Sequence, residues 1–115
     1  MAHRRIAATV LCLVVICGAA ILWPAYKHIV AQRKLAETAR QYRARAERGD
    51  ADAECRLGYA HYYGKGVRQD YAEAVRWYRK AADQGIAKAQ YDLGYLYHHG
   101  QGVPQDNAEA FRWFL

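Results

Sequence analysis

An internal repeat of 36 residues constrains the fold of this chain more than any other feature of its sequence. When the sequence is shifted by 36 positions, residues 51–79 align with residues 87–115, and 15 of the 29 aligned positions are identical. Self-similarity at a fixed period of this length is the signature of stacked repeat units. The same shift upstream aligns Tyr42-Arg43 with Tyr78-Arg79. Residues 27–50 are therefore interpreted as a basic linking helix that resembles a degenerate half-repeat.

Each 36-residue unit contains residues that typically begin and end the two helices of a hairpin. The first helix is predicted over residues 51–63, with Asp50 as its N-cap and Gly64 as its C-terminal stop. Asp70 is predicted to cap the second helix, and Glu73 follows three residues later as in a capping box. The fold class is therefore predicted to be all-α, with α/α hairpin repeats at 51–86 and 87–115. Further residues predicted to begin helices, end helices or form turns are Gly49, Gly66, Gly85, Asp106 and Glu109.

Small residues at regular positions indicate how the hairpins pack. One hairpin cannot bury its apolar face alone, so neighbouring hairpins must stack. We expect small side chains to let the helix backbones approach closely and a few large ones to fill the remaining space. The small residues are Ala53, Gly58, Ala74, Ala81 and Ala82, and the large ones are Leu57, Val67, Val75 and Trp77.

An apolar segment precedes the repeats. Ile6–Trp23 is 18 residues long and contains no charged residue, and Arg4 and Arg5 lie before it. This length approaches the ~20 residues that a helix needs to cross a bilayer core. Residues 1–26 are therefore predicted to be a transmembrane helix or signal anchor. A single-pass membrane protein is expected. The short basic N-terminal tail favours repeats on the extracytoplasmic (periplasmic) side, whereas the larger number of Lys and Arg after the segment favours repeats in the cytoplasm. The alternative is a signal cleaved within residues 1–20, which would make the protein secreted.

The charge of +6 is concentrated beside the apolar segment. Residues 27–48 contain seven basic and two acidic residues, whereas residues 49–115 contain eight basic and nine acidic residues. A nucleic-acid-binding domain should carry the positive charge on its folded part, so no nucleic-acid partner is expected. The basic flank fits anionic lipid headgroups, and a solvated arginine-rich helix is the alternative interpretation.

Candidate chemistry is sparse. The chain contains no serine, and its three cysteines show no paired spacing. The adjacent His98 and His99 point about 100° apart on a helix, and no His or Cys cluster has the spacing of a zinc site. His61 aligns with Tyr97, which indicates a packing role. We therefore predict no catalytic residue, no cofactor, no metal and no enzymatic activity.

The segment from Leu93 to Asp106, followed by Ala110 and Trp113, resembles the Sel-one-like repeat (SLR) family, a branch of the tetratricopeptide-like (TPR-like) helical solenoids. The resemblance covers residues 51–115 well, residues 30–50 weakly and residues 1–29 not at all. It implies a scaffold or adaptor that binds a protein or peptide partner, with no reaction and no cofactor. Alternatives are an exported cell-wall or antibiotic hydrolase of the same repeat class, whose members carry regular cysteine pairs, and a truncated fragment without independent function.

Two features of the repeats suggest binding surfaces. In related solenoids the first helices line a concave face, so Tyr59, Tyr62, Tyr91, Tyr95 and His98 are predicted to form a partner-binding patch. The alternative is that these tyrosines pack between the repeats. The sequence stops at Leu115, midway through a second helix, and self-association through this uncapped edge is a further expectation.

Overall fold

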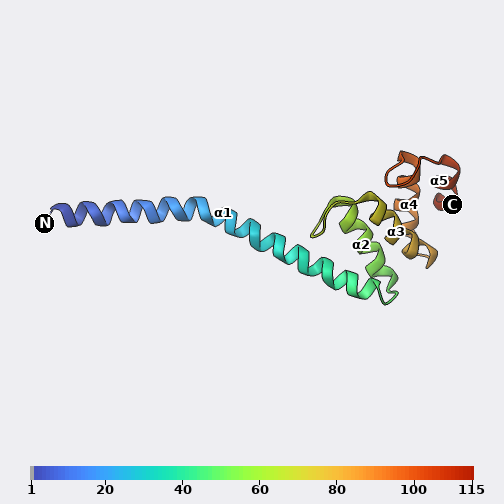
Figure 1. The fold of residues 1–115 in the computed structure, drawn as a ribbon, viewed down its shortest axis with the longest axis horizontal. Coiled ribbons are helices and arrows are strands. Elements are labelled where there is room, and N and C mark those ends of the chain that lie inside the picture. The colour runs from blue at the N-terminus through green and yellow to red at the C-terminus, as the bar shows by residue number, and fades with distance from the viewer. Residues whose placement is uncertain (1) are drawn as a thin grey trace. The chain divides into compact units, whose positions relative to one another are not determined.

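The computed structural model describes residues 2–115, and all of its regular structure is helical (Figure 1). The predicted all-α class is confirmed, since no strand occurs among these residues. The chain divides into two compact units, Met1–Arg33 and Lys34–Leu115, which are described separately below. The helices are α1 (Ala2–Ala46), α2 (Ala51–Tyr63), α3 (Tyr71–Asp83), α4 (Ala87–His99) and α5 (Asn107–Phe114).

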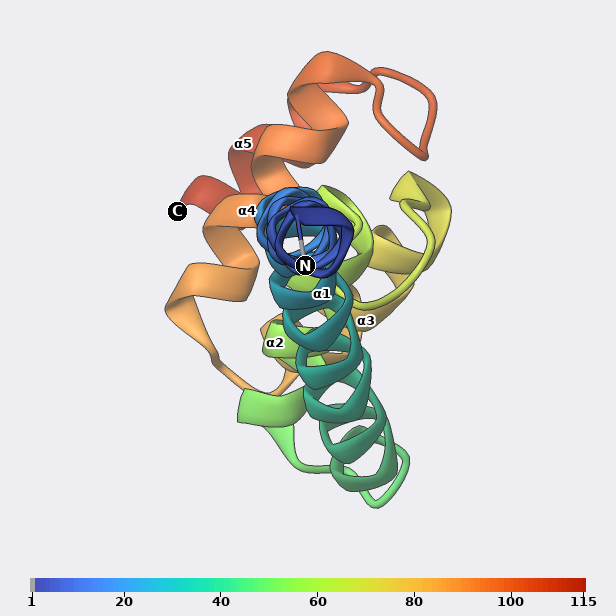
Figure 2. The ribbon, with the colours of Figure 1, turned by 90° about the vertical axis from the view of Figure 1, so that its left-hand side faces the viewer.

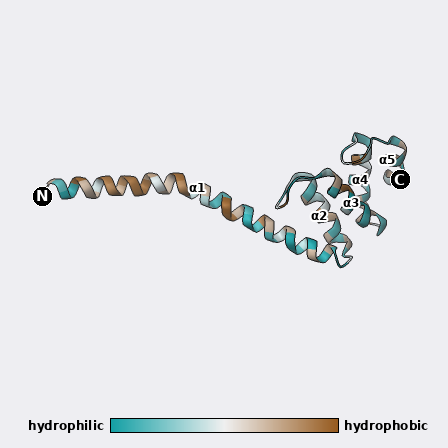
Figure 3. Cartoon of the chain, viewed as in Figure 1, coloured by the Kyte–Doolittle hydropathy of each residue, from teal (hydrophilic) through white to brown (hydrophobic). Residues whose placement is uncertain are grey.

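The first unit is the apolar part of α1. Its brown colour in Figure 3 marks the hydrophobic run, and an 18-residue window reaches a mean hydropathy of 2.7 with none of it buried. Within the described residues, α1 is long and apolar enough to cross a membrane. Trp23 and Tyr26 stack at 6.0 Å between ring centroids, and the Lys27 ammonium lies 5.4 Å from the Trp23 ring. These amphipathic side chains fit a membrane interface.

The second unit is a chain of stacked hairpins (Figure 2). Helix α2 packs on α3, α3 packs on α4, and α4 packs on α5, so the major contacts join helices that are neighbours along the chain. This nearest-neighbour arrangement is the architecture of a solenoid. The core therefore lies between successive hairpins, and its fully buried large side chains are Leu57, Leu93 and Leu96.

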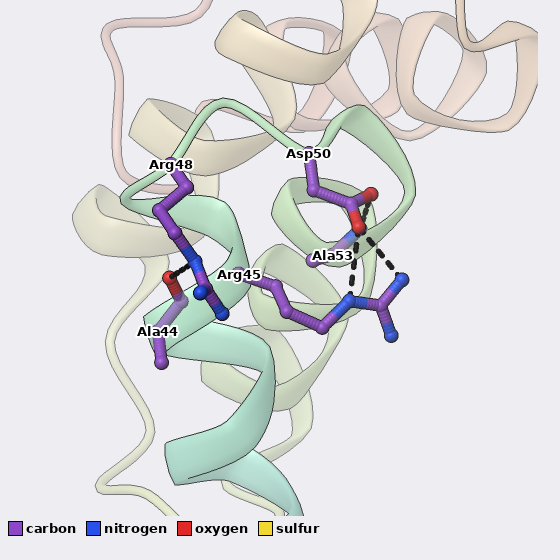
Figure 4. Close-up of polar contacts among 5 residues, drawn as sticks. All are labelled: Ala44, Arg45, Arg48, Asp50 and Ala53. Carbon is purple, nitrogen blue, oxygen red and sulfur yellow. Dashed lines mark hydrogen bonds and ion pairs between the residues drawn. The ribbon is translucent and has the colours of Figure 1, made fainter.

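The predicted N-caps at Asp50, Asp70 and Asp106 are confirmed, but the capping box predicted at Glu73 is incomplete. The Asp70 amide donates to the His61 carbonyl at 2.9 Å, and the Glu73 carboxylate accepts from Arg76 instead. The side chain of Asp50 accepts a hydrogen bond from the Ala53 amide at 3.1 Å, and Arg45 donates to the same carboxylate at 2.7 and 2.9 Å (Figure 4). Asp70 and Asp106 accept from the amides three residues ahead in the same way. Each cap satisfies an amide that the helix itself leaves unpaired.

A glycine on the first helix of each hairpin allows the close packing of helices that the sequence predicts. A Cβ atom added to Gly58 would lie 2.8 Å from the Tyr78 ring, and one added to Gly94 would lie 2.6 Å from the Phe114 ring. These two pairs are related by the 36-residue repeat. The first helix of each hairpin therefore receives the aromatic side chain of the second helix in a space that only glycine leaves free.

Two tryptophans occupy equivalent positions in successive repeats. Trp77 is buried, whereas Trp113 is partly buried. The indole N–H of each lacks a hydrogen-bond partner within residues 2–115. Each indole belongs to a cluster of small and aliphatic residues offset by 36 positions. For Trp77 these are Ala46, Ala53 and Leu57, and for Trp113 they include Ala82, Ala89 and Leu93.

The hairpin loops touch the backbone of the preceding helix. Gly66 has a φ of +74°, and a Cβ atom there would overlap the carbonyl of Leu35 and lie 2.8 Å from the Ala36 amide nitrogen. Gly102 has a φ of +72° and meets the backbone at Tyr71-Ala72 in the same way. The end of α1 after Arg33 thus contacts the first hairpin as α3 contacts the second.

Candidate functional site: a tyrosine-lined groove

Four of the five predicted site residues lie together. Tyr59 and Tyr62 from α2 and Tyr91 and Tyr95 from α4 line one hollow of about 280 Å³. His98 does not line this hollow, and its Nδ1 atom instead lies 2.9 Å from the Asn107 side-chain oxygen. We call this hollow the tyrosine groove. It is lined by Tyr59, Tyr62, Tyr63, Tyr78, Lys88, Tyr91, Asp92 and Tyr95.

The lining of the groove comes from α2, α3 and α4. Tyr78 of α3 is only 2% exposed. Tyr63 and Tyr91 are 56% and 62% exposed. The Tyr62 and Tyr63 rings lie edge to face at 4.7 Å between centroids, and Tyr59 lies 4.6 Å from Tyr63. The groove therefore offers several ring faces and edges that are already held in place.

Four groove residues were missed by the sequence interpretation. Tyr63 lies beside the predicted patch residues on α2, and Tyr78 lies across the hairpin on α3. Helical periodicity on one helix therefore groups neither residue with the predicted patch. Lys88 and Asp92 are four residues apart on α4, on the face that also carries Tyr91 and Tyr95. The i, i+4 spacing was a usable signal for this pair.

An ion pair lies within the groove. The Lys88 ammonium donates to the Asp92 carboxylate at 2.8 Å, and this hydrogen bond raises the pKa of Lys88. Burial and then the charge of Asp92 raise the pKa of Tyr78, and burial raises that of Tyr62. These two phenols stay protonated at neutral pH, and the Tyr62 hydroxyl donates to the Gln101 side-chain oxygen at 3.3 Å.

Two further hollows share residues with the tyrosine groove. One, of about 390 Å³, is lined by Asp52, Cys55, Arg56, Tyr59, Ile86 and Lys88. The other, of about 170 Å³, lies where α1 meets α2, and we call it the α1–α2 hollow. It is lined by Leu35, Thr38, Ala39, Tyr42, Arg56, Tyr59, Ala60 and Lys65.

Cys55 and His61 occupy buried positions in the repeats. Cys55 is only 7% exposed in the inter-repeat core, and burial raises the pKa of its thiol. His61 is buried, as its predicted packing role requires, and Arg43 donates to its Nε2 atom at 3.3 Å. His98 and His99 are exposed. Within residues 2–115, no group of three or more His, Cys, Asp or Glu side chains is placed to hold a metal ion.

Solved structures share this fold. The crystal structure of a Sel1 repeat protein from Oxalobacter formigenes is 43% identical with a TM-score of 0.65, over 66% of this chain and 58% of that one. The structure of c5321, a protective antigen of uropathogenic Escherichia coli with an SLR fold, is 38% identical with a TM-score of 0.63. That match covers 78% of this chain and 23% of the antigen, so the present chain spans less than two thirds of either relative.

A search among curated proteins found no match. The family model described as "Sel1 repeat" matches residues 51–86 and residues 87–115, which together make up more than half of the chain. Proteins built from these repeats generally mediate protein–protein interactions, and such scaffolds are generally non-enzymatic. The repeat spacing, the stacked hairpins and this match lead to one conclusion: the chain belongs to the Sel1-repeat family.

Proposed function

We propose that this protein is a membrane-tethered scaffold that binds a protein partner in the tyrosine groove. The observation that carries the proposal is the convergence of Tyr59, Tyr62, Tyr91 and Tyr95 from two repeats on one hollow. Tyrosine is enriched among the residues that dominate binding energy at protein interfaces, because its ring is large and its hydroxyl can donate or accept. Rings that are already packed against one another lose little conformational entropy on binding.

The tether is the apolar part of α1. Its hydropathy and its exposed surface support a membrane-spanning helix. The short basic tail with Arg4 and Arg5 is typical of a signal anchor and favours export of the repeats, which we propose, whereas the seven basic residues of 27–48 would by the positive-inside rule favour a cytoplasmic location. Lys27 and the arginines that follow would lie next to the lipid headgroups, where each basic residue contributes about 1 kcal/mol of attraction to an anionic surface. The comparisons support neither the membrane tether nor the alternative of an exported hydrolase.

The end of α1 completes the proposed scaffold. We assign residues 34–46 to a half-repeat, because Leu35-Ala36 meets the Gly66 loop as Tyr71-Ala72 meets the Gly102 loop. This assignment extends the stacked surface up to the segment that precedes the repeats.

Site-specific photocrosslinking in cells tests the binding site. We would introduce p-benzoylphenylalanine in place of Tyr91 or Tyr95 in the full chain, with Lys80 as the control position, which is exposed on α3 and does not line the groove. A discrete crosslinked partner at positions 91 and 95 but not at position 80 is expected. Equal crosslinking at all three positions, or none at 91 and 95, contradicts the proposed site.

Membrane attachment is tested separately. The full chain should stay in the membrane pellet after extraction with alkaline carbonate, and a phosphatase fused after Leu115 should be active only if the repeats are exported. Release into the supernatant as a shortened chain would instead indicate a cleaved signal. An inactive fusion on a retained chain would place the repeats in the cytoplasm.

A further inference from the structure

We infer that the partner of this protein presents an extended segment with an acidic side chain beside an apolar or aromatic one. The acidic side chain is seated at the α1–α2 hollow, and the apolar one enters the tyrosine groove. This inference rests on the proposed function and specifies the chemistry of the partner.

The α1–α2 hollow is positively charged. Of the side chains that line it, Arg56 and Lys65 are cations, and none is a carboxylate. The rest of its lining is largely apolar, so a charge that enters the hollow meets less water than on an open surface. Interactions between charges strengthen as the surrounding dielectric falls. A carboxylate is therefore favoured in this hollow, and a cation is disfavoured.

Arg56 is unpaired among residues 2–115, unlike its counterpart in the second repeat. The 36-residue shift places Arg56 on Asp92 and Asp52 on Lys88, so the two repeats carry charged residues of opposite sign at the same positions. In the second repeat, Lys88 and Asp92 form an ion pair at 2.8 Å. In the first repeat, Arg56 lies 5.6 Å from the Tyr42 ring centroid, and within residues 2–115 it forms no ion pair. Its guanidinium keeps its donors for a ligand.

Lys65 supplies the second cation. Its ammonium donates to the Tyr59 hydroxyl at 3.2 Å and lies 5.1 Å from the Tyr59 ring centroid and 5.8 Å from that of Tyr63. In the part of the chain that the structure describes, Lys65 also forms no ion pair with a carboxylate. The tyrosine rings hold the ammonium next to the hollow without neutralising its charge.

Tyr59 joins the two recognition elements. Its side chain lines both the α1–α2 hollow and the tyrosine groove, so the two hollows are neighbours on one surface. In the groove, Lys88 is already neutralised by Asp92, and most of the lining is aromatic. The surface thus changes from cationic at the end of α1 to aromatic between α2 and α4. Because residues 49–115 carry nine acidic and eight basic residues, a nucleic acid is not favoured as the occupant.

Selection from a random dodecapeptide display library tests the inference. The bait is the full chain in nanodiscs of zwitterionic phosphatidylcholine, and empty nanodiscs are used for counter-selection. We expect the enriched peptides to combine Asp or Glu with Tyr, Phe, Trp or Leu at a constant spacing. The double variant Arg56→Glu/Lys65→Glu should lose the preference for acidic residues and keep the preference for apolar ones. Arg68→Glu is the matched control, because Arg68 is exposed in the same hairpin loop and lines neither hollow.

The affinity of one enriched acidic peptide gives the magnitude. Loss of a charge-assisted hydrogen bond should weaken its binding to Arg56→Glu about tenfold or more, and Arg68→Glu should bind it like the unmodified chain. Raising the salt concentration should also weaken binding to the unmodified chain. If peptides are enriched and lose binding in Tyr91→Ala but show no acidic preference, the inference fails while the proposed function stands. If no peptide is enriched over empty nanodiscs, both fail.

Discussion

Replacing Gly66 by alanine should separate the end of α1 from the first hairpin. Gly66 has a φ of +74°, and a Cβ atom at this position would overlap the Leu35 carbonyl. Backbone atoms of a packed helix cannot turn aside as a flexible side chain can, so the loop or the helix must shift. Gly85 is the matched control, because it also has a positive φ of +89° but has open space where its Cβ would lie.

The two variants share one cost and differ in the other. A left-handed backbone costs a residue with a Cβ atom about 1–2 kcal/mol relative to glycine, and this cost applies to Gly66→Ala and to Gly85→Ala. Forcing an extra carbon into a packed contact costs about 1–3 kcal/mol more, and this cost applies to Gly66→Ala alone. The free energy of unfolding should therefore fall by about 2–5 kcal/mol in Gly66→Ala and by about 1–2 kcal/mol in Gly85→Ala.

Urea unfolding of the full chain in detergent micelles, followed by far-ultraviolet circular dichroism, measures both free energies. Hydrogen exchange monitored by mass spectrometry locates the change, and residues 34–46 should lose protection in Gly66→Ala but not in Gly85→Ala. If the two variants are destabilised equally and residues 34–46 exchange at the same rate in both, the loop does not contact the α1 backbone. The assignment of a half-repeat to residues 34–46 would then be refuted.

Further predictions concern the caps and the core. Asp70→Ala should lower the free energy of unfolding by about 1 kcal/mol in a urea titration, because the Glu73 amide loses its acceptor. The hydrogen bond from the Ala53 amide, and then Arg45, lower the pKa of Asp50. This carboxylate therefore stabilises the fold above its unfolded pKa, and the stabilisation is lost as the pH falls through the folded pKa. Asp50→Asn should reduce the change of melting temperature with pH across that acid range. Trp77→Ala should cost about 3–5 kcal/mol because the indole is buried, whereas Trp77→Phe should cost much less, since no partner for the indole N–H lies among residues 2–115. Comparable losses for the two Trp77 variants in a urea titration would contradict this account.

Local structure was predictable because it depends on local chemistry. The bounds of the first repeat helix, Ala51–Tyr63, match the prediction, since Asp50 and Gly64 act on the backbone within one turn of the helix ends. The two indoles in equivalent clusters also follow from the repeat, because a unit that recurs with the same small residues must stack in the same way.

The lining of the groove was only partly predictable. Periodicity on a single helix grouped Tyr59 with Tyr62, but it could not show that Tyr78 from the second helix lies in the same hollow. Nor could it show that His98 would lie outside the groove, with its ring beside Asn107. These placements depend on how one hairpin is rotated against the next. The sequence of each helix encodes that rotation only through contacts with its neighbours.

The contact of Gly66 and Gly102 with main-chain atoms has an evolutionary consequence. Where a loop packs on side chains, a substitution on one surface requires a matching substitution on the other. Here the loop glycine packs on the peptide backbone, so it contacts Leu35-Ala36 and Tyr71-Ala72 equally well. Copies of the 36-residue unit could thus be inserted or deleted by recombination without compensating substitutions at the joint. Such an array can change its length, and with it the extent of its stacked surface, while each individual unit diverges freely in the charges that it displays.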